Sequence, residues 1–295
     1  NTFLGPKGII CVWHVNANAS KLPAHILVID DPCVCPCICA LGECMISGSD
    51  DGTMHLWDLR EASRQMNLYS TTNSNDLHTL LKKMKGACHH VNSITFDPEE
   101  SEPHDCAISD MCRIPHDNAA DKVSAWNIAS IDVTLKVIIW SVTDLGARDK
   151  SLKDNVTEST LRLINKRTLM IPTCNYSLSS LQESFPSMPL STNSSDIESI
   201  GIHFFPRCRD KFLVTIQGGE ILHYSLSDGR QLPKKPKIVY CYEIHKISKS
   251  NPAVVSVDFC PFDNQQFLVG WNDGTFALFH EAFARPTRVW DACHL

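Results

Sequence analysis

The sequence predicts an all-β fold made of repeated antiparallel strand units, and three observations lead to that prediction. The clearest unit is Met45–Arg60, where an apolar strand, an Asp-Gly turn and a second strand ending in Trp57-Asp58 follow one another. An Asp-Gly pair supplies the positive φ that a tight hairpin turn requires. Related units recur along the chain. Several apolar strands also end in a proline, which cannot donate to a strand ladder.

The repeated units share all or part of a plan in which an aromatic residue stands near the end of the second strand. Besides Met45–Arg60 they are Gly8–Val15 with Trp13, Trp126–Asp144 with Trp140, Phe212–Gly229 with a Gly218-Gly219 turn and Tyr224, and Phe267–His280 with an Asp273-Gly274 turn and Phe279. Such units are the signature of WD40 repeats. We therefore predict a WD40 β-propeller over residues 1–295, with seven blades in the full protein and with blades or segments missing from this chain.

Each blade is expected to open with a strand that leads into a proline-containing turn. Cys33–Leu41 fits this description less closely than three other stretches, which are Val91–Pro98, Ile197–Pro206 and Val254–Pro261. A histidine commonly precedes the first strand of a WD40 blade, and we assign His89 and His90 to that place ahead of Val91–Pro98.

The spacing of the aromatic residues predicts insertions between blades. Trp13 and Trp57 are separated by the ~40–45 residues of one WD40 repeat. The intervals from Trp57 to Trp140 and from Trp140 to Tyr224 are each about twice as long. Each long interval therefore holds either an insertion or a degenerate blade.

Two polar stretches are the predicted insertions. Residues 61–87 include a short helix at 76–84, and residues 149–196 form a long, poorly regular region with a strand at Leu161–Ile171. The join at Asp132–Thr134 is abrupt, because a glycine turn is expected there. We hypothesise that loops are omitted from the chain at such joins. A step between consecutive Cα atoms well beyond ~3.8 Å would mark an omission, and unbroken geometry would refute the hypothesis.

The signature residues are predicted to be structural. Blades stack radially, so Trp57 and Trp140 pack between sheets, and each indole N–H needs a partner. Ser47 and Asp50 are predicted to supply it for Trp57, whereas the Trp140 unit lacks the matching Ser and Gly, which predicts an incomplete network there. The remaining signature positions are Trp13, Gly52, Asp58, Gly218, Gly219, Tyr224, Asp273, Gly274 and Phe279.

Charge and hydropathy argue against several classes of protein. The net charge is −6 and no basic stripe is present, so no nucleic-acid partner is expected. No apolar run approaches the ~20 residues of a membrane-spanning helix, so no membrane insertion is expected. The first residues lack the layout of a signal peptide and begin within a strand-like pattern. Residues 287–295 resemble a link that leaves the Phe279 blade, and we expect a segment of a longer protein.

The 14 cysteines indicate a reduced intracellular protein, because many of them lie inside apolar strand-like runs. The alternating cysteines of Cys33–Cys39 place four thiols on one face of a strand. This arrangement suits a packed core, and a zinc site is the alternative, although its usual C-x2–4-C spacing is absent. A second candidate metal cluster, for which an incidental loop is the favoured interpretation, contains His104, Cys106, Cys112 and His116.

No catalytic motif is present in the sequence. It has no G-x-S-x-G nucleophile elbow, no P-loop and no H-E-x-x-H pair. Gly218-Gly219 is followed by a strand pattern rather than a helix, which argues against a phosphate cradle. We therefore predict a protein that is not an enzyme, with no catalytic residues, no cofactor and no bound metal.

The order of the imperfect repeats resembles one family. The stretches GPKGIICVWHV from Gly5, GSDDGTMHLWDLRE from Gly48, LKVIIWSV from Leu135 and VVSVDFCPFDNQQFLVGWNDGTFALFH from Val254 carry the resemblance. They are similar to the propellers of WD-repeat dynein intermediate chains, in particular those of the cytoplasmic dynein that drives retrograde intraflagellar transport.

The resemblance implies a non-catalytic motor subunit of the cytoplasm and cytoskeleton, found in the cilium and at the ciliary base or centrosome. The propeller of such a subunit binds the tail of a dynein heavy chain. A region upstream of it binds dynein light chains and pairs with a second intermediate chain. The resemblance identifies no heavy-chain contact residue in this sequence. The alternative is a WD-repeat adaptor of another complex, such as a ubiquitin-ligase substrate receptor or a trafficking coat. Both have the same fold, and an upstream light-chain-binding segment would favour dynein.

Overall fold

The elements that the structure describes are β-strands. The computed structural model describes residues 8–13, 25–29, 37–41, 44–59, 90–92, 103–115, 125–144, 161–171, 199–216, 221–226, 237–241 and 253–290. Every regular element in these ranges is a β-strand, which confirms the predicted all-β class.

The strands form one two-stranded sheet and four four-stranded sheets, all antiparallel and all following chain order. The first sheet contains β1 (Gly8–Val12) and β2 (His25–Ile29). The second contains β3 (Cys37–Leu41), β4 (Cys44–Gly48), β5 (Met54–Asp58) and β6 (His90–Asn92), and the third β7 (Ile108–Arg113), β8 (Ala125–Asp132), β9 (Lys136–Asp144) and β10 (Leu161–Met170). The fourth contains β11 (Ser199–Phe204), β12 (Lys211–Ile216), β13 (Ile221–Ser225) and β14 (Lys237–Cys241), and the fifth β15 (Val254–Phe259), β16 (Gln266–Trp271), β17 (Phe276–His280) and β18 (Arg288–Trp290).

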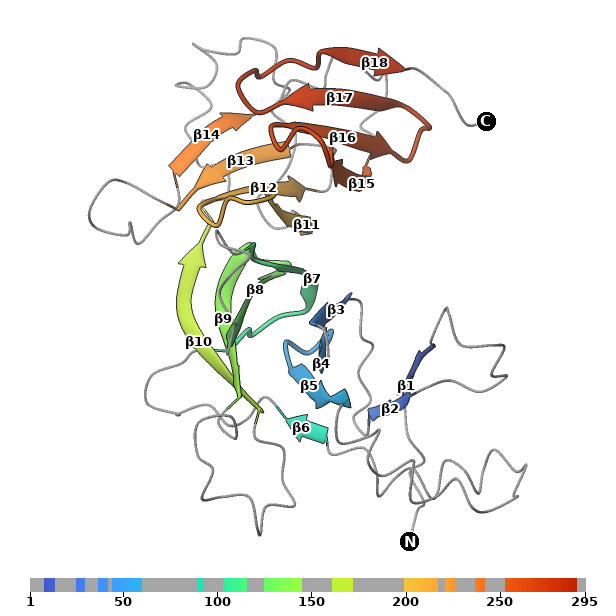
Figure 1. Ribbon diagram of the computed structural model, residues 1–295, viewed down its shortest axis with the longest axis vertical. Helices are drawn as coiled ribbons and strands as arrows, with labels where there is room; N and C mark the ends of the chain where they lie inside the picture. Colours follow the sequence, from blue (N-terminus) through green and yellow to red (C-terminus); the bar gives the residue numbers. More distant parts are fainter. Residues whose placement is uncertain are drawn as a thin grey trace, which may run out of the picture.

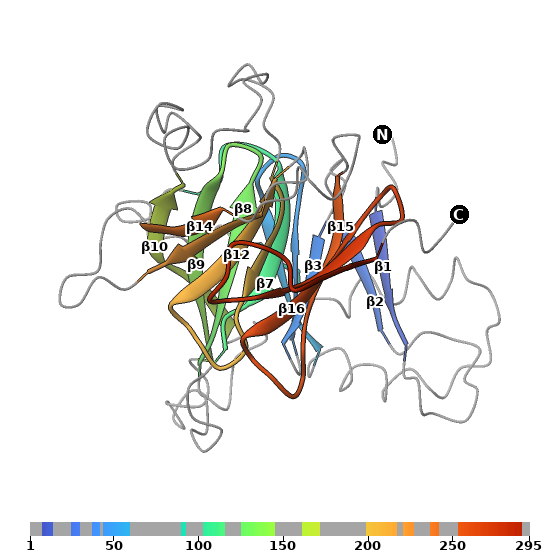
Figure 2. The same ribbon diagram turned by 90° about the horizontal axis from the view of Figure 1, so that it is seen from above.

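The sheets stand one after another along an arc (Figure 1). The two-stranded sheet lies at one end of the arc and the fifth sheet, drawn in red, at the other; Figure 2 shows the same stack from above. Four-stranded meanders stacked radially in this way are propeller blades. The predicted WD40 propeller architecture is therefore confirmed, as an arc that does not close over the described ranges. The count of seven blades and the extent of the domain over residues 1–295 stay predictions.

Neighbouring sheets cover both faces of the strands between them. Every residue of β4 and of β5 is buried, which explains why these strands read as continuous apolar runs rather than alternating ones. Trp57 packs with Leu27 and Met45 toward the first sheet, while Ile46 and Leu56 belong to the core shared with the third sheet.

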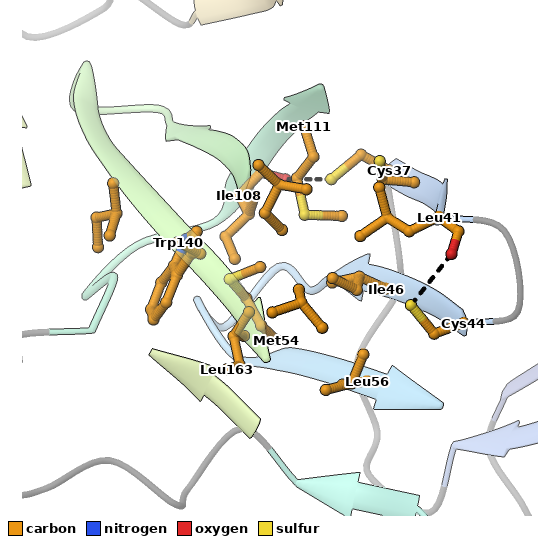
Figure 3. Packing of buried hydrophobic residues seen from close by; sticks show 14 of the residues in the cluster. Cys37, Leu41, Cys44, Ile46, Met54, Leu56, Ile108, Met111, Trp140 and Leu163 are labelled. Carbon is orange, nitrogen blue, oxygen red and sulfur yellow. Dashed lines mark hydrogen bonds between the residues drawn. The ribbon is translucent and has the colours of Figure 1, made fainter. Parts of the chain in front are cut away.

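The second and third sheets interlock in one core (Figure 3). Cys37 and Ile46 from the second sheet meet Ile108 and Trp140 from the third. The Cys37 thiol also donates to the carbonyl oxygen of Ile108 over 3.9 Å. The units that hold Trp57 and Trp140 are thus direct neighbours, and the long interval between them is an insertion.

The remaining sheets pack in the same way. Val137 of the third sheet shares a core with Phe212 and Tyr224 of the fourth. Phe205, at the end of β11, shares a core with Phe279 of the fifth sheet. The interval from Trp140 to Tyr224 is therefore also an insertion between adjacent blades.

One predicted strand has a different position from the one expected. Val91–Pro98 was expected to open a blade, but β6 is the last strand of the second sheet and pairs with β5, with His90 opposite Trp57. The next blade opens with β7 instead. A short apolar run does not distinguish a first strand from a fourth, because both are edge strands with the same alternation. His89 lies outside the described residues.

Other predicted strands are confirmed. Strands β3, β11 and β15 open their sheets within Cys33–Leu41, Ile197–Pro206 and Val254–Pro261. The strand expected at Leu161–Ile171 is β10, the fourth strand of the third sheet. Residues 287–295 contain β18, so this segment completes the fifth sheet rather than only linking it onward.

The helix expected at 76–84 and most of the insertion at 149–196 lie outside the described residues. Within the ranges that are described, the chain contains no helix of the length and apolar character needed to span a membrane.

Candidate functional site

The third sheet contains a buried hydrogen-bond network around Trp140. The indole Nε1 of Trp140 donates to Oγ of Ser130 over 2.7 Å, and Nε2 of His104 lies 2.6 Å from the same hydroxyl. On its other side, Nδ1 of His104 lies 2.8 Å from Oδ2 of Asp132. With its proton on Nδ1, the imidazole donates to Asp132 and accepts from Ser130, so every polar group in the chain of contacts has a partner.

Asp132 also shapes the turn between β8 and β9. Its Oδ1 accepts hydrogen bonds from the backbone N–H groups of Thr134 (2.9 Å) and Lys136 (3.0 Å) and from the Thr134 hydroxyl (2.6 Å). Leu135, between them, has a φ of 65°. This left-handed conformation costs a leucine about 1–2 kcal/mol. Burial of Leu135, 1% exposed in the core between the third and fourth sheets, offsets that cost.

The network fixes the protonation of Asp132. Burial raises its pKa, but hydrogen bonds from His104, Thr134 and Lys136 outweigh burial and hold the pKa below its ordinary value of 3.8. Asp132 is therefore ionised at neutral pH and acts as an acceptor. Its contribution to stability is present above the ordinary pKa and is lost as pH falls through the lowered folded value.

The prediction of an incomplete network at Trp140 was wrong. The required serine is Ser130, on β8, and Leu135 adopts the positive φ that was expected of a glycine. The abrupt join at Asp132–Thr134 is a hydrogen-bonded turn, in which the Leu135 N–H donates to the Asp132 carbonyl oxygen over 3.0 Å. Omission of loops elsewhere in the chain stays a hypothesis.

The second sheet has the same plan. Gly52 and Trp57 occupy the places of Leu135 and Trp140, because in each sheet a positive-φ residue precedes a buried tryptophan by five positions. Gly52 has a φ of 87°. On this alignment the predicted Ser47 matches Ser130; Ser47 is fully buried on β4.

A carboxylate also accepts hydrogen bonds in the turn of the second sheet. Oδ1 of Asp51 accepts hydrogen bonds from the backbone N–H of Thr53, at 2.9 Å, and from its hydroxyl. Asp50 is exposed beside it. Nearby, Nε2 of His55 lies 3.0 Å from Oγ of Ser49, and the His55 ring stacks on Trp57. The role of Ser47 and Asp50 toward the Trp57 N–H stays a prediction.

The fifth sheet repeats the turn of the second. Gly274 has a φ of 82° and precedes the fully buried Phe279 by five positions. Asp273 accepts a hydrogen bond from the Thr275 N–H over 2.9 Å. The structure therefore places Asp273, Gly274 and Phe279 together in one hairpin, as the sequence pattern indicated.

The other signature residues differ in how deeply they are buried. Tyr224 is fully buried on β13, and Asp58 is buried at the end of β5. Trp13 directly follows β1 and is 53% exposed. Gly218 and Gly219 lie outside the described residues.

Polar bonds also join neighbouring sheets. Oδ2 of Asp110, on β7, accepts a hydrogen bond from the N–H of Ile202, on β11, over 2.9 Å. A Cβ at Gly201 would lie 2.9 Å from the same oxygen, so the glycine allows this close approach. Lys211, at the start of β12, forms an ion pair with Glu281, which follows β17. Each contact holds one blade against the next.

Burial shifts the pKa of several partly or fully buried groups. Burial raises the pKa of Asp110, against the opposing hydrogen bonds from the N–H groups of Ile202 and Met111. Burial also lowers the pKa of His203 and of His223 to about 4, so both imidazoles are neutral at neutral pH.

The cysteines and histidines do not gather into a metal site in the part of the chain that is described. There, no three His, Cys, Asp or Glu side chains are grouped to hold an ion. Cys37 and Cys39 are buried on one face of β3, which confirms the core interpretation for these two. Burial raises the pKa of Cys112 well above 9.0, so its thiol is protonated. Cys33, Cys35 and His116 lie outside the described residues.

The exposed apolar side chains are concentrated in the fifth sheet. Five of them belong to the fifth sheet and its turns: Val255, Phe262, Leu268, Phe283 and Val289. Phe262 and Phe283 lie in turns, whereas Val255, Leu268 and Val289 lie on strands of this last sheet of the arc. Exposed aromatic residues on turns that a sheet holds in place are suited to recognition of another macromolecule. The sequence did not single out these residues, since isolated apolar residues carry no motif.

The chain has a distant relative among known proteins. The chain matches no protein-family model. It is similar to cytoplasmic dynein 2 intermediate chain 1 of Mus musculus, with 23% identity over 314 aligned residues. The resemblance to WD-repeat dynein intermediate chains is confirmed. The alignment covers 98% of this chain and 28% of the mouse protein, so the chain spans less than a third of its relative's length.

Proposed function

We propose that this chain is the propeller part of a non-catalytic intermediate chain of a ciliary cytoplasmic dynein. In this proposal the propeller binds the tail of a dynein heavy chain and supports retrograde intraflagellar transport. The observation that carries it is the similarity to mouse cytoplasmic dynein 2 intermediate chain 1 across 98% of the chain.

The construction of the blades supports a binding role. The buried polar groups of the third sheet, such as Asp132 and Ser130, bind other parts of the same sheet. Such groups stabilise a rigid scaffold, while the turns that join the strands are exposed to partners.

The remaining proposed partners bind the full-length protein outside this chain. A region upstream of this chain binds dynein light chains and pairs with a second intermediate chain. The assembled motor resides in the cytoplasm and the cytoskeleton, at the ciliary base or centrosome and within the cilium.

Affinity purification of the tagged full-length protein from ciliated cells, followed by mass spectrometry, tests the proposal. We expect a dynein heavy chain and dynein light chains among the co-purified proteins. A matched variant that lacks residues 1–295 should lose the heavy chain and keep the light chains. Recovery of cullin adaptors or coat subunits without any dynein subunit would contradict the proposal and favour a WD-repeat adaptor.

A further inference from the structure

Two turns at one end of the fifth sheet carry exposed aromatic rings. Phe262, in the turn between β15 and β16, is 96% exposed, and Phe283, in the turn between β17 and β18, is 57% exposed. In an antiparallel meander the first and third turns lie at the same end of the sheet. The N–H of Glu281 donates to the carbonyl oxygen of Gln265 over 2.7 Å, so the two turns are in direct contact.

The turn of the neighbouring fourth sheet lies beside them. Lys211, which follows the turn between β11 and β12, forms an ion pair with Glu281. This turn presents Arg207 and Arg209 to solvent, and the turn between β17 and β18 presents Arg285. We refer to these exposed side chains as the aromatic–arginine patch: Arg207, Arg209, Phe262, Phe283 and Arg285.

The turns that form the patch are rigid. Asp263 accepts hydrogen bonds from the Gln265 N–H, at 3.0 Å, and from the Gln266 side-chain amide, at 2.8 Å. The N–H of Phe283 donates to the carbonyl oxygen of His280 over 3.0 Å, and the two rings lie 5.3 Å apart. These hydrogen bonds order the backbone of both turns, which lowers the entropy cost of binding a partner there.

The backbone conformation of Arg207 independently indicates that this turn has a functional role. It has a φ of 60°, and the Cys208 N–H donates to the Phe205 carbonyl oxygen over 3.1 Å. Pro206 and Arg207 are thus the central residues of a turn whose second central position favours glycine. An arginine in this strained backbone conformation, on an exposed turn, points to a functional reason for its side chain.

The charge of the patch indicates the chemistry of its partner. The whole chain has a net charge of −6, yet the patch carries three arginines, of which Arg207 stands exposed on the strained turn. Guanidinium groups pair with carboxylates in a bidentate manner, and aromatic residues with arginine are the typical centre of a protein interface.

We infer that the aromatic–arginine patch is the docking surface for a protein segment that combines apolar side chains with Asp or Glu. This inference rests on the proposed function and assigns the segment to the tail of the dynein heavy chain. The rings of Phe262 and Phe283 cover apolar side chains of that segment, and Arg207 pairs with its carboxylates.

Titration of the full-length protein with a purified cytoplasmic dynein 2 heavy-chain tail tests the inference. The double variant Phe262→Asp with Phe283→Asp should raise Kd at least about tenfold, because central aromatic contacts dominate interface affinity. Arg207→Gly should raise Kd about threefold or more, because it removes the guanidinium while relieving the strained turn. The control Ile164→Asp, at a 45% exposed position on β10, should bind as the wild type does.

The outcomes separate the inference from the proposed function. Equal affinity of the wild type and the patch variants would overturn the inference and leave the proposed function standing. Absence of heavy-chain binding by the wild type would overturn both. Self-association of the wild type that the double variant abolishes, measured by light scattering, would overturn the inference by making a second copy the occupant. If circular dichroism shows that the double variant is unfolded, the single variant Phe262→Ala takes its place, with the same expected direction.

Discussion

The interior of the third sheet and the aromatic–arginine patch both contain aromatic and charged side chains. These side chains are buried in the third sheet and exposed in the patch. Trp140 is 1% exposed and its N–H binds Ser130, whereas the ring of Phe262 is 96% exposed on a rigid turn. Asp132 is ionised and surrounded by donors of its own sheet, whereas Arg207 extends from a strained turn into solvent. Burial with every polar group satisfied is typical of architecture, and rigid exposure is typical of recognition. Substitutions in the two regions should therefore affect stability and binding separately.

The largest effect on stability is expected from Trp140→Ala. This change removes a fully buried ring and leaves the Ser130 hydroxyl without the indole donor. We expect the free energy of unfolding to fall by about 3–5 kcal/mol. Urea unfolding followed by circular dichroism measures this loss. A loss below about 1 kcal/mol would show that the network is not part of the core.

Gly52→Ala should have the next largest effect. A Cβ at this position would lie 2.5 Å from the carbonyl oxygen of His104, and the φ of 87° is strained for alanine. We expect a loss of about 2–3 kcal/mol, read from the denaturation midpoint at constant m-value. An unchanged midpoint would mean that the turn of the second sheet does not abut the third.

Asp132→Asn should lower stability by about 1–3 kcal/mol at neutral pH, because the charged acceptor of four donors becomes neutral. The folded-state pKa of Asp132 is lowered, so the wild type loses this stabilisation as pH falls below the ordinary value of 3.8. The difference between variant and wild type should therefore shrink in acid. Unfolding free energies between about pH 6 and pH 3 measure it, with the exposed Asp258→Asn as a control. A difference in unfolding free energy that grows in acid would contradict the lowered folded-state pKa of Asp132.

Arg207→Gly should have the smallest effect and the opposite sign. Glycine adopts a φ of 60° without the cost of about 1–2 kcal/mol that an L side chain incurs, although glycine also gains entropy in the unfolded state. We expect a net gain of about 0.5–1 kcal/mol in unfolding free energy. Differential scanning calorimetry measures the rise in Tm. A destabilised variant would show that the Arg207 side chain supports the fold rather than a partner.

Much of the blade plan was predictable from the sequence. The aromatic positions of Trp57, Trp140, Tyr224 and Phe279 are all fully buried as expected, because each stands at a fixed distance from a hairpin turn. Trp13 has the same sequence pattern and is half exposed, so the pattern alone does not determine burial.

The missed features depend on contacts that no local pattern encodes. His104 and Asp132 are 28 positions apart, and their pairing follows from how the segment before β7 folds over β8. Leu135 contradicts the local preference of leucine, and only its burial between sheets holds it in a left-handed turn. Phe262 belongs to no motif, and its meaning comes from exposure together with the rigidity of its turn.

Hydrogen–deuterium exchange of the full-length protein, with and without the heavy-chain tail, tests the account most directly. Binding should slow exchange in residues 205–211, 260–266 and 280–287. Exchange in residues 125–144 of the third sheet should stay unchanged. Slowed exchange in residues 125–144 with no change in the three turns would contradict these assignments. It would mean that the heavy-chain tail binds the third sheet and not the aromatic–arginine patch.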